Sequence, residues 1–246
     1  MKISTAITDI KEEKEYIRGY SLDELMRKKT FVETIFLLLR GELPTVKETV
    51  MMNALFTAAI DHGPGTASAQ TARIVASAKN SMHTAVAAGI LAMGERHGSA
   101  IEGAAQFFQA YKNTEEVDVL AQELKTKKIR VPGYGHPFLE EDHRSAVLFA
   151  LAQEQGIYGA HCSFAEKFHV AVNTKSSKKI AFNIDGAMAA ILLDMGFDAR
   201  LMKGFFIIAR IPGLVAQVYE EMADDPGIRR LDQSDIQYTG PEHRSL

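Results

Sequence analysis

Two short segments, far apart in the chain, hold side chains suited to moving protons. Residues 131–137 read VPGYGHP and place His136 between a glycine and a proline, while residues 183–186 read NIDG and contain Asp185. Glycine in such a loop lets the backbone come close to a ligand, and the imidazole can then point into a cleft. One imidazole and one carboxylate are typical of acid/base catalysis. The alternative for His136 is a loop histidine that caps a neighbouring helix.

Asp185 also has a plain structural interpretation. It precedes the apolar run 186–193, so its carboxylate is predicted to accept the free amides at the start of that helix. A carboxylate at the end of so apolar a helix is partly desolvated, which raises its basicity and suits proton transfer at carbon. The two interpretations are compatible, and we expect both to apply.

Two further histidines stand at breaks between apolar helical stretches. His62 lies in residues 61–65 (DHGPG), and His97 lies in residues 96–98 (RHG) after a long apolar stretch. Either ring could instead contact the carbonyl end of the helix before it. Because all four polar sites lie at breaks, they are predicted to line one cleft.

Basic side chains suggest what that cleft would bind. Arg144, Arg210 and Arg230 are ordinary surface charges if they lie apart, but converging guanidinium groups suit a dicarboxylate or tricarboxylate. Residues 175–179 (KSSKK) form a compact basic cluster directly before Asn183. This cluster is either a solvated loop or a contact for the phosphates of a cofactor.

The composition argues against several other classes of function. With 28 basic and 31 acidic residues and a formal charge of −3, the chain has no basic excess for nucleic acid or an anionic membrane. Its one cysteine, Cys162, excludes a disulfide framework and a cysteine-based structural zinc site. The sequence contains no GxxxxGK[ST], HExxH or GxSxG motif, so we expect no metal, no nucleotide hydrolysis and no serine nucleophile.

The start of the chain does not resemble a targeting segment. It lacks the apolar core of about 7–15 residues that a signal peptide carries, and no stretch reaches about 18 uninterrupted apolar residues. We therefore expect a cytoplasmic protein that does not bind a membrane.

The elements that must position these residues are predicted to be helices. Apolar residues recur at helical spacing through most of the chain, for example at Ala72, Val75, Val86 and Ile90, and strand-like alternation is scarce. The pattern predicts an all-α protein, in which residues 1–20 could form a short β-hairpin.

Several residues are typical of helix ends. Ser21 and Glu24 predict a capping box, and Gly41 with Pro44 predicts the end of the helix that follows. Pro212 lies inside the last long apolar segment, where it is predicted to kink or split the helix.

Taken in order, segments from both ends of the chain resemble the citrate synthase family, and most closely the citryl-CoA lyase module at the C-terminal part of ATP-citrate lyase. The segments are residues 18–21 (RGYS), 38–45 (LLRGELPT), 61–64 (DHGP), 235–238 (DIQY) and 241–246 (PEHRSL). The resemblance implies one citrate-synthase-like all-α unit over residues 1–246, with a large subdomain (1–97 and 190–246) and a small subdomain (98–189). It also implies a homodimer or higher homo-oligomer.

The resemblance implies catalytic roles for three residues. His136 matches the histidine that contacts the oxaloacetate carbonyl or the citryl hydroxyl, and Asp185 matches the acid/base at the acetyl methyl. His97 matches the histidine that hydrogen-bonds the thioester oxygen.

It implies binding roles for six more. The substrate-carboxylate ligands would be His62, Arg144, Arg210 and Arg230, the last in a position that a neighbouring subunit commonly contributes. Lys178 and Lys179 fall in the region that contacts coenzyme A phosphates.

The implied reaction is cleavage of citryl-CoA to acetyl-CoA and oxaloacetate, metabolites of the tricarboxylic acid cycle. Coenzyme A would enter as part of the substrate, without a metal or a nucleoside triphosphate, and a separate citryl-CoA synthetase could supply that substrate. Gln233 and the residues after it replace the Arg-Pro-Arg element of synthases, which favours the lyase, whereas His97 keeps citrate synthase open as an alternative. A non-catalytic subunit that binds coenzyme A is the alternative from another class.

Overall fold

A small antiparallel sheet opens the chain. A computed structural model describes residues 2–95, 97–98, 100–135 and 140–245. Strands β1 (Thr8–Lys11) and β2 (Lys14–Ile17) form a hairpin, and β3 (Tyr20–Ser21) adds to β2. Glu12 and Glu13 at its turn have φ of 51° and 62°, the backbone twist that a two-residue hairpin requires. The predicted hairpin is confirmed.

Three helices follow the sheet: α1 (Leu22–Lys28), α2 (Phe31–Arg40) and α3 (Val46–Ala59). The predicted capping box at Ser21 is wrong, because the Ser21 side chain makes no capping hydrogen bond. Ser21 also belongs to β3, where its backbone pairs with Tyr16. Strand pairing therefore defines where α1 begins.

Two complete capping boxes start the next two helices. Thr30 and Thr45 accept hydrogen bonds from the amides of Glu33 (3.2 Å) and Glu48 (3.3 Å), whose carboxylates accept in return from the threonine amides. Each box satisfies two amides that a helix N-terminus leaves free. Gly41, with φ of 92°, ends α2 as predicted.

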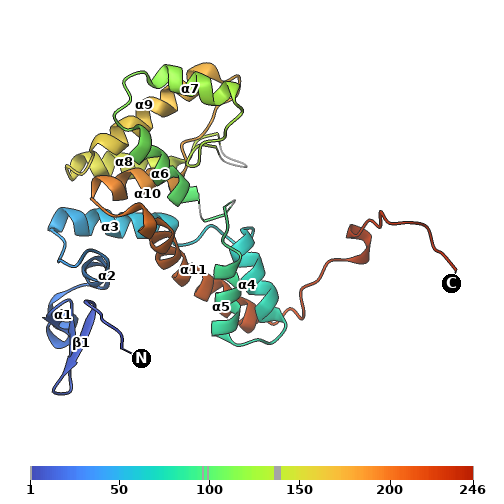
Figure 1. The fold of residues 1–246 in the computed structure, drawn as a ribbon. Helices are drawn as coiled ribbons and strands as arrows, with labels where there is room; N and C mark the ends of the chain where they lie inside the picture. The colour runs from blue at the N-terminus through green and yellow to red at the C-terminus, as the bar shows by residue number, and fades with distance from the viewer. Residues whose placement is uncertain (1, 96, 99, 136–139, 246) are drawn as a thin grey trace. The chain divides into compact units, whose positions relative to one another are not determined.

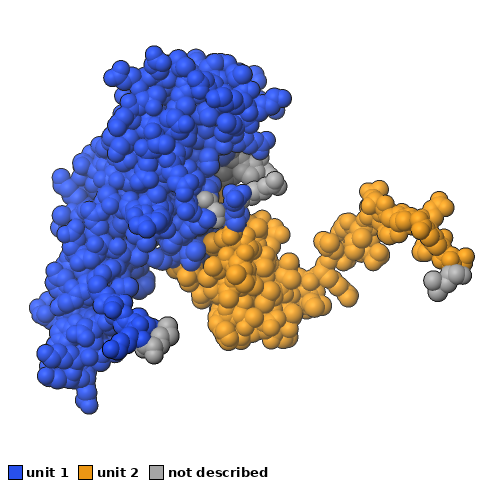
Figure 2. Space-filling view, in the orientation of Figure 1, with its two compact units in different colours: residues 1–61, 94–210 blue, residues 62–93, 211–246 orange. Residues whose placement is uncertain are grey.

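The chain divides into two compact units, coloured separately in Figure 2. The first contains residues 1–61 and 94–210, and the second contains residues 62–93 and 211–246. The predicted division into a large and a small subdomain stays a prediction.

Helix α10 (Ile184–Asp194) forms the core of the first unit. It contacts α3, α6 (Ala100–Tyr111), α8 (His143–Glu154) and α9 (Ala160–Lys175), and every residue from Gly186 to Leu193 is buried (Figure 1). Each fully buried leucine or isoleucine contributes roughly 1.5–3 kcal/mol to folding. Helix α7 (Val117–Thr126) packs on α9.

Asp194, at the end of α10, holds the start of α9. Its carboxylate accepts hydrogen bonds from the amides of Gly159 (2.8 Å), His161 (3.0 Å) and Cys162 (2.9 Å). The His161 ring is bonded to the same carboxylate through Nδ1 at 2.8 Å. Cys162 is fully buried, and burial with the nearby Asp194 carboxylate raises the pKa of its thiol.

Small residues let the helices of the second unit approach closely. Helices α4 (Ala67–Ser77) and α5 (Met82–Leu91) pack together with Leu214 and Val218. A Cβ atom on Gly89 would lie 2.9 Å from the Ser68 carbonyl oxygen, closer than side chains are found to pack. Glycine is therefore needed at this contact.

The last long helix, α11 (Met202–Asp224), follows the 3₁₀ helix η1 (Ala199–Leu201). It continues through Pro212, so the predicted split is wrong. Proline removes one backbone donor, but residues on either side, Ala209 and Leu214, stay buried and stabilise the continuous helix. By length and composition alone, 199–224 could cross a membrane, and 44% of its apolar window is buried inside the molecule.

A largely exposed C-terminal segment follows α11 and contains a second 3₁₀ helix, η2 (Gln233–Asp235).

Candidate active site

The loop that leads to His136 is joined to the start of α10 by backbone pairing. Gly135 donates to the carbonyl of Ala181 at 2.6 Å, and Asn183 donates to the carbonyl of Gly133 at 3.0 Å. Tyr134 and Phe182 form the β-bridge between them. His136 itself lies outside the described residues.

Two glycines allow this close pairing. A Cβ atom on Gly133 would lie 2.8 Å from the Cα of Gly186, and one on Gly186 would lie 2.7 Å from the Gly133 carbonyl oxygen. Gly133 also has φ of 88°, a conformation that other residues rarely adopt. The glycines of the two motifs are therefore in contact with each other.

Tyr134 anchors the same loop in an aromatic cluster. Its hydroxyl donates to the carbonyl of Ala165 at 3.0 Å, and its ring contacts Phe108, Phe168 and Phe182. Burial raises the pKa of Tyr134, so it stays protonated. The loop is held by packing as well as by hydrogen bonds.

Asn183, and not Asp185, caps α10. The Asn183 side chain accepts from the Gly186 amide at 3.1 Å and donates to the Gly135 carbonyl at 2.8 Å. The predicted N-cap at Asp185 is wrong, because pairing with Gly133 places Asn183 at the cap and puts Asp185 inside the first turn. The carboxylate of Asp185 is thus free for another role.

The Asp185 carboxyl group lies in an unusual environment. Its Oδ1 is buried and has no hydrogen-bond partner among the described residues. Burial raises the pKa of Asp185 to about 6, while the charges of Arg210 and Arg144 lower it and that of Asp142 raises it. The predicted desolvation is confirmed, and a carboxyl with this pKa can exchange a proton near neutral pH.

Arg144 is oriented by Asp142, a residue that the sequence analysis missed. Arg144 Nε and Nη2 each donate to one oxygen of Asp142 at 2.8 Å. Asp142 also caps α8 and accepts the amide of Ile184, next to Asp185, at 3.0 Å. Its buried carboxylate therefore fixes both the arginine and the start of α10. In the sequence, the only signal for this role was an aspartate just before an apolar helix.

Arg210 lies on α11 and is buried. Its Nε donates to the carbonyl of Ala59 at 2.8 Å, and its guanidinium lies 4.9 Å from the ring centre of Phe206. Burial lowers its pKa, and the carboxylates of Asp61 and Asp185 act in the opposite direction. Arg210, Arg144 and Asp185 are thus near enough for their charges to interact.

The remaining predicted residues lie in several places. His97 belongs to the first unit, in a tight turn where its backbone pairs with Gly94 in both directions at 2.8 and 2.9 Å. His62 and Arg230 are exposed and belong to the second unit. The roles of His97, His62 and Arg230 stay predictions.

A large hollow opens beside the Tyr134 loop. It has a volume of about 690 Å³ and is lined by Lys125, Arg130 and Lys175 together with apolar residues of α7 and α9. Lys178 and Lys179 follow Lys175 closely in the sequence and are exposed, but they are not among the described residues that line this hollow. Lys179 is paired with Glu141. Among the residues described, no group of acidic, histidine or cysteine side chains gathers as a metal ion would need.

Comparison with known proteins decides the family. The family model for the citrate synthase C-terminal domain matches residues 1–51 and 46–231. The chain belongs to the citrate synthase family.

Curated relatives that the chain matches are longer proteins. ATP-citrate synthase beta chain protein 1 of Oryza sativa subsp. japonica is 26% identical over 197 residues, which cover 73% of this chain and 32% of that protein. The chain thus spans about a third of this relative's length.

Solved structures share the fold. A citryl-CoA lyase from Hydrogenobacter thermophilus is 44% identical, with a TM-score of 0.93 over 99% of this chain and 97% of that one. An ATP citrate lyase from Methanothrix soehngenii, in complex with citrate and coenzyme A, is 22% identical, with a TM-score of 0.88 over 98% of this chain and 42% of that one. The predicted all-α, citrate-synthase-like fold is confirmed.

Proposed function

We propose that the chain cleaves citryl-CoA to acetyl-CoA and oxaloacetate. The observation that carries this proposal is the buried Asp185 carboxyl, which has a pKa of about 6 and lies directly beside the loop that leads to His136. The likeness to a citryl-CoA lyase over nearly the full length of both chains supports the choice of reaction.

The reaction is a retro-Claisen cleavage. His136 accepts the proton of the citryl hydroxyl as the carbon–carbon bond breaks, and the bonding electrons pass to the acetyl-CoA part as an enolate. Asp185 then donates its proton to the enolate carbon. The pKa of about 6 leaves part of the Asp185 population protonated at neutral pH, as this step needs.

The enolate is the difficult intermediate, because its parent carbon acid is far weaker than a carboxylic acid. His97 would donate a hydrogen bond to the thioester oxygen as negative charge develops there. One such donor is typically worth roughly 3 kcal/mol of transition-state stabilisation. Arg144 and Arg210 would hold the substrate carboxylates with their planar guanidinium groups.

The hollow beside the Tyr134 loop suits the coenzyme A portion. It places three basic side chains, Lys125, Arg130 and Lys175, around an apolar wall that includes Phe168. Phosphates would pair with the cations, and the pantetheine arm would lie along the apolar residues. The roles of Lys178 and Lys179 stay predictions.

A direct assay tests the reaction. Purified protein is mixed with citryl-CoA, and the oxaloacetate released is measured with malate dehydrogenase and NADH. We expect Asp185→Ala and His136→Ala each to abolish turnover, while Asp198→Ala, an exposed carboxylate paired with Arg200, keeps it. Near-normal rates in either active-site variant would refute the assignment.

A charge reversal tests the coenzyme A site. Lys125→Glu should raise the KM for citryl-CoA by about tenfold, because it places an anion where phosphates are expected. Lys127→Glu is the matched control, since Lys127 caps the end of the helix that carries Lys125 but is not part of the described lining of this hollow. Equal effects of the two reversals would argue against the site.

Citrate synthase is the second candidate, favoured by the family match and by His97. It makes the same bond and then hydrolyses the thioester. Acetyl-CoA and oxaloacetate should release free coenzyme A with a synthase and none with a pure lyase. Saturable coenzyme A binding without either reaction would instead indicate a non-catalytic subunit.

We also propose a homo-oligomer that works on tricarboxylic acid cycle metabolites in the cytoplasm, without a metal or a nucleoside triphosphate and with citryl-CoA supplied by a separate synthetase. Large apolar side chains of the second unit are exposed, including Ile74 (50%), Leu91 (85%) and Tyr219 (68%). Contiguous exposed apolar patches mark association surfaces. Light scattering after size-exclusion chromatography would test this, and a monomer at all concentrations would contradict it.

A further inference from the structure

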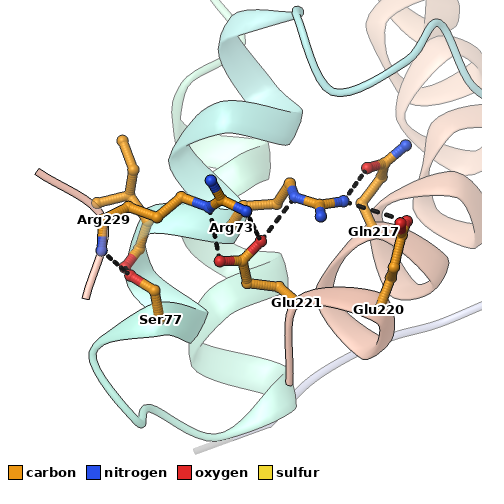
Figure 3. A network of polar contacts seen from close by, with 7 residues as sticks. Arg73, Ser77, Gln217, Glu220, Glu221 and Arg229 are labelled. Carbon is orange, nitrogen blue, oxygen red and sulfur yellow. Dashed lines mark hydrogen bonds and ion pairs between the residues drawn. The ribbon is translucent and has the colours of Figure 1, made fainter. Parts of the chain in front are cut away.

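A buried carboxylate on α11 binds two arginines from different parts of the second unit. Glu221 is 1% exposed, and its Oε1 and Oε2 accept from Arg229 Nε (2.6 Å) and Nη2 (2.8 Å). Oε2 also accepts from Arg73 Nε on α4 at 2.8 Å. Figure 3 shows Glu221 between the two guanidinium groups.

The same arrangement fixes the backbone after α11. The Arg229 amide donates to the Ser77 hydroxyl at 2.9 Å, so both the main chain and the side chain of Arg229 are attached to helices (Figure 3). Arg73 is held in turn by Gln217 at 2.7 Å and by Glu220 at 3.2 Å. We call Glu221, Arg73 and Arg229 the clamp.

The clamp acts on a segment that is otherwise exposed. All described residues from 222 to 245 are exposed, and the paired Arg229 attaches this segment to α4 and α11. Arg230 follows directly and shares with Arg73 and Arg229 the lining of a hollow of about 530 Å³. The path of the chain at Arg230 therefore depends on the clamp.

The negative charge of Glu221, as well as the shape of its side chain, is needed to bind both arginines. A carboxylate can accept from both guanidinium groups at once, whereas an amide has one acceptor oxygen and two donors that would oppose the arginines. The hydrogen bond from Arg229 lowers the pKa of Glu221, with burial opposing and Arg73 adding to the lowering. Glu221 is therefore ionised at neutral pH.

We propose that Glu221 is a positioning residue for the reaction. By clamping Arg229 to α4 and α11 it sets the position of Arg230, which binds a substrate carboxylate. This inference rests on the proposed function, because the family resemblance implies that ligand role for Arg230.

A double-mutant cycle tests the clamp. The kcat and KM for citryl-CoA are measured for wild type, Glu221→Gln, Arg230→Ala and the double variant. We expect Glu221→Gln to raise KM about tenfold and to have little further effect when Arg230 is already alanine, because the two residues would act through one contact. Asp225→Asn, which breaks an exposed ion pair with Lys79 at the same end of α11, should leave KM unchanged.

Hydrogen–deuterium exchange separates positioning from general stability. In Glu221→Gln the amides of residues 229–231 should exchange faster, while those of α4 and α5 stay as protected as in wild type. If Glu221→Gln does not fold, Arg229→Gln serves instead, since its side chain is 45% exposed and its loss leaves Glu221 paired with Arg73.

The outcomes are distinct. If the effects of Glu221→Gln and Arg230→Ala on KM add in the double variant, or if KM is unchanged in Glu221→Gln, the positioning role of Glu221 is overturned. Turnover of citryl-CoA by the wild type would still support the proposed function. No wild-type turnover of citryl-CoA would overturn both.

Discussion

The raised pKa of Asp185 follows from what surrounds its carboxyl group. Asn183 performs the capping, so Asp185 is left with a buried Oδ1 that has no partner among the described residues. Removing water disfavours the charged form, and two nearby guanidinium groups, on Arg144 and Arg210, limit the effect. The balance keeps the pKa of Asp185 near 6, between an ordinary carboxyl and neutrality.

The rate of cleavage should therefore depend on the protonation of Asp185. Cleavage needs protonated Asp185, so kcat should fall as pH rises above about 6, by about tenfold per pH unit once deprotonation dominates. Initial rates of cleavage at saturating citryl-CoA between about pH 5 and 8 check this. A kcat that stays constant over this range would contradict Asp185 as the acid.

Asp185 should also make the protein less stable at high pH. Its pKa is raised in the folded state, from 3.8 to about 6, so stability falls as pH rises from about 4 to 6 and stays reduced above that. The reduction corresponds to about 3 kcal/mol for a shift of about 2 units. Asp185→Asn should therefore be more stable than wild type at pH 8 by up to this amount, and equally stable near pH 4. Urea unfolding at the two pH values measures the difference, and a variant less stable at both would contradict the burial argument.

At the scale of elements, carboxylates at helix starts join segments that are distant in the sequence. Asp142 joins the start of α8 to that of α10, and Asp194 joins the end of α10 to the start of α9. Each accepts backbone amides that a helix leaves unpaired. Asp142 in this way holds Arg144 and the helix that carries Asp185.

Loss of Asp194 should destabilise the first unit. Asp194→Ala leaves three amides and the His161 ring without their acceptor, which we expect to cost about 3 kcal/mol of unfolding free energy. Burial opposes, but the bonds from His161 and the amides lower the pKa of Asp194, so its contribution is present above pH 3.8 and is lost in acid. Asp198→Ala, at an exposed cap, should cost less than about 1 kcal/mol. Thermal unfolding of the two variants makes the comparison, and equal losses would be inconsistent with it.

Local patterns predicted the helices better than their ends. Apolar spacing indicated the all-α class, and Gly41 ended α2 as expected. Ser21 failed as a capping box because strand pairing takes up its backbone, and Asp185 failed as a cap because Asn183 pairs with Gly133. Both failures come from partners outside the local segment, which a pattern of neighbouring residues does not contain.

The sequence predicted the charged residues of the candidate site better than the residues that hold them in place. Arg144, Arg210 and Asp185 were all named from the sequence, and their charges do interact. Asp142 was missed, since its value lies in reaching the Ile184 amide across the fold. Glu221 was missed because its partners, Arg73 and Arg229, lie in other segments of the chain.

At the scale of the whole molecule, the predicted site residues are divided between two compact units. Asp185 belongs to the first and Arg230 to the second, and the boundary between the units falls within α11. A ligand contributed by a neighbouring subunit would make each site depend on two chains.

Mixed oligomers test this dependence. At citryl-CoA concentrations well below the wild-type KM, Asp185→Asn and Arg230→Ala should each show little activity alone. If Arg230 serves a neighbour's site, random mixing of equal amounts into dimers should restore about a quarter of wild-type activity, since half of the dimers are mixed and one of their two sites is intact. Subunits would be exchanged by unfolding and refolding together, with each variant refolded alone as the control. No recovery on mixing would place Arg230 in its own chain's site or outside the site.

Cys162 makes the protein suitable for labelling at a chosen surface position. It is the one cysteine of the sequence, it is fully buried, and its thiol pKa is raised, so the native protein should resist alkylating reagents. A cysteine placed on the surface could then carry a fluorophore without removal of the natural sulfhydryl. In unlabelled protein, the rate at which a maleimide reaches position 162 would report how often the start of α9 opens.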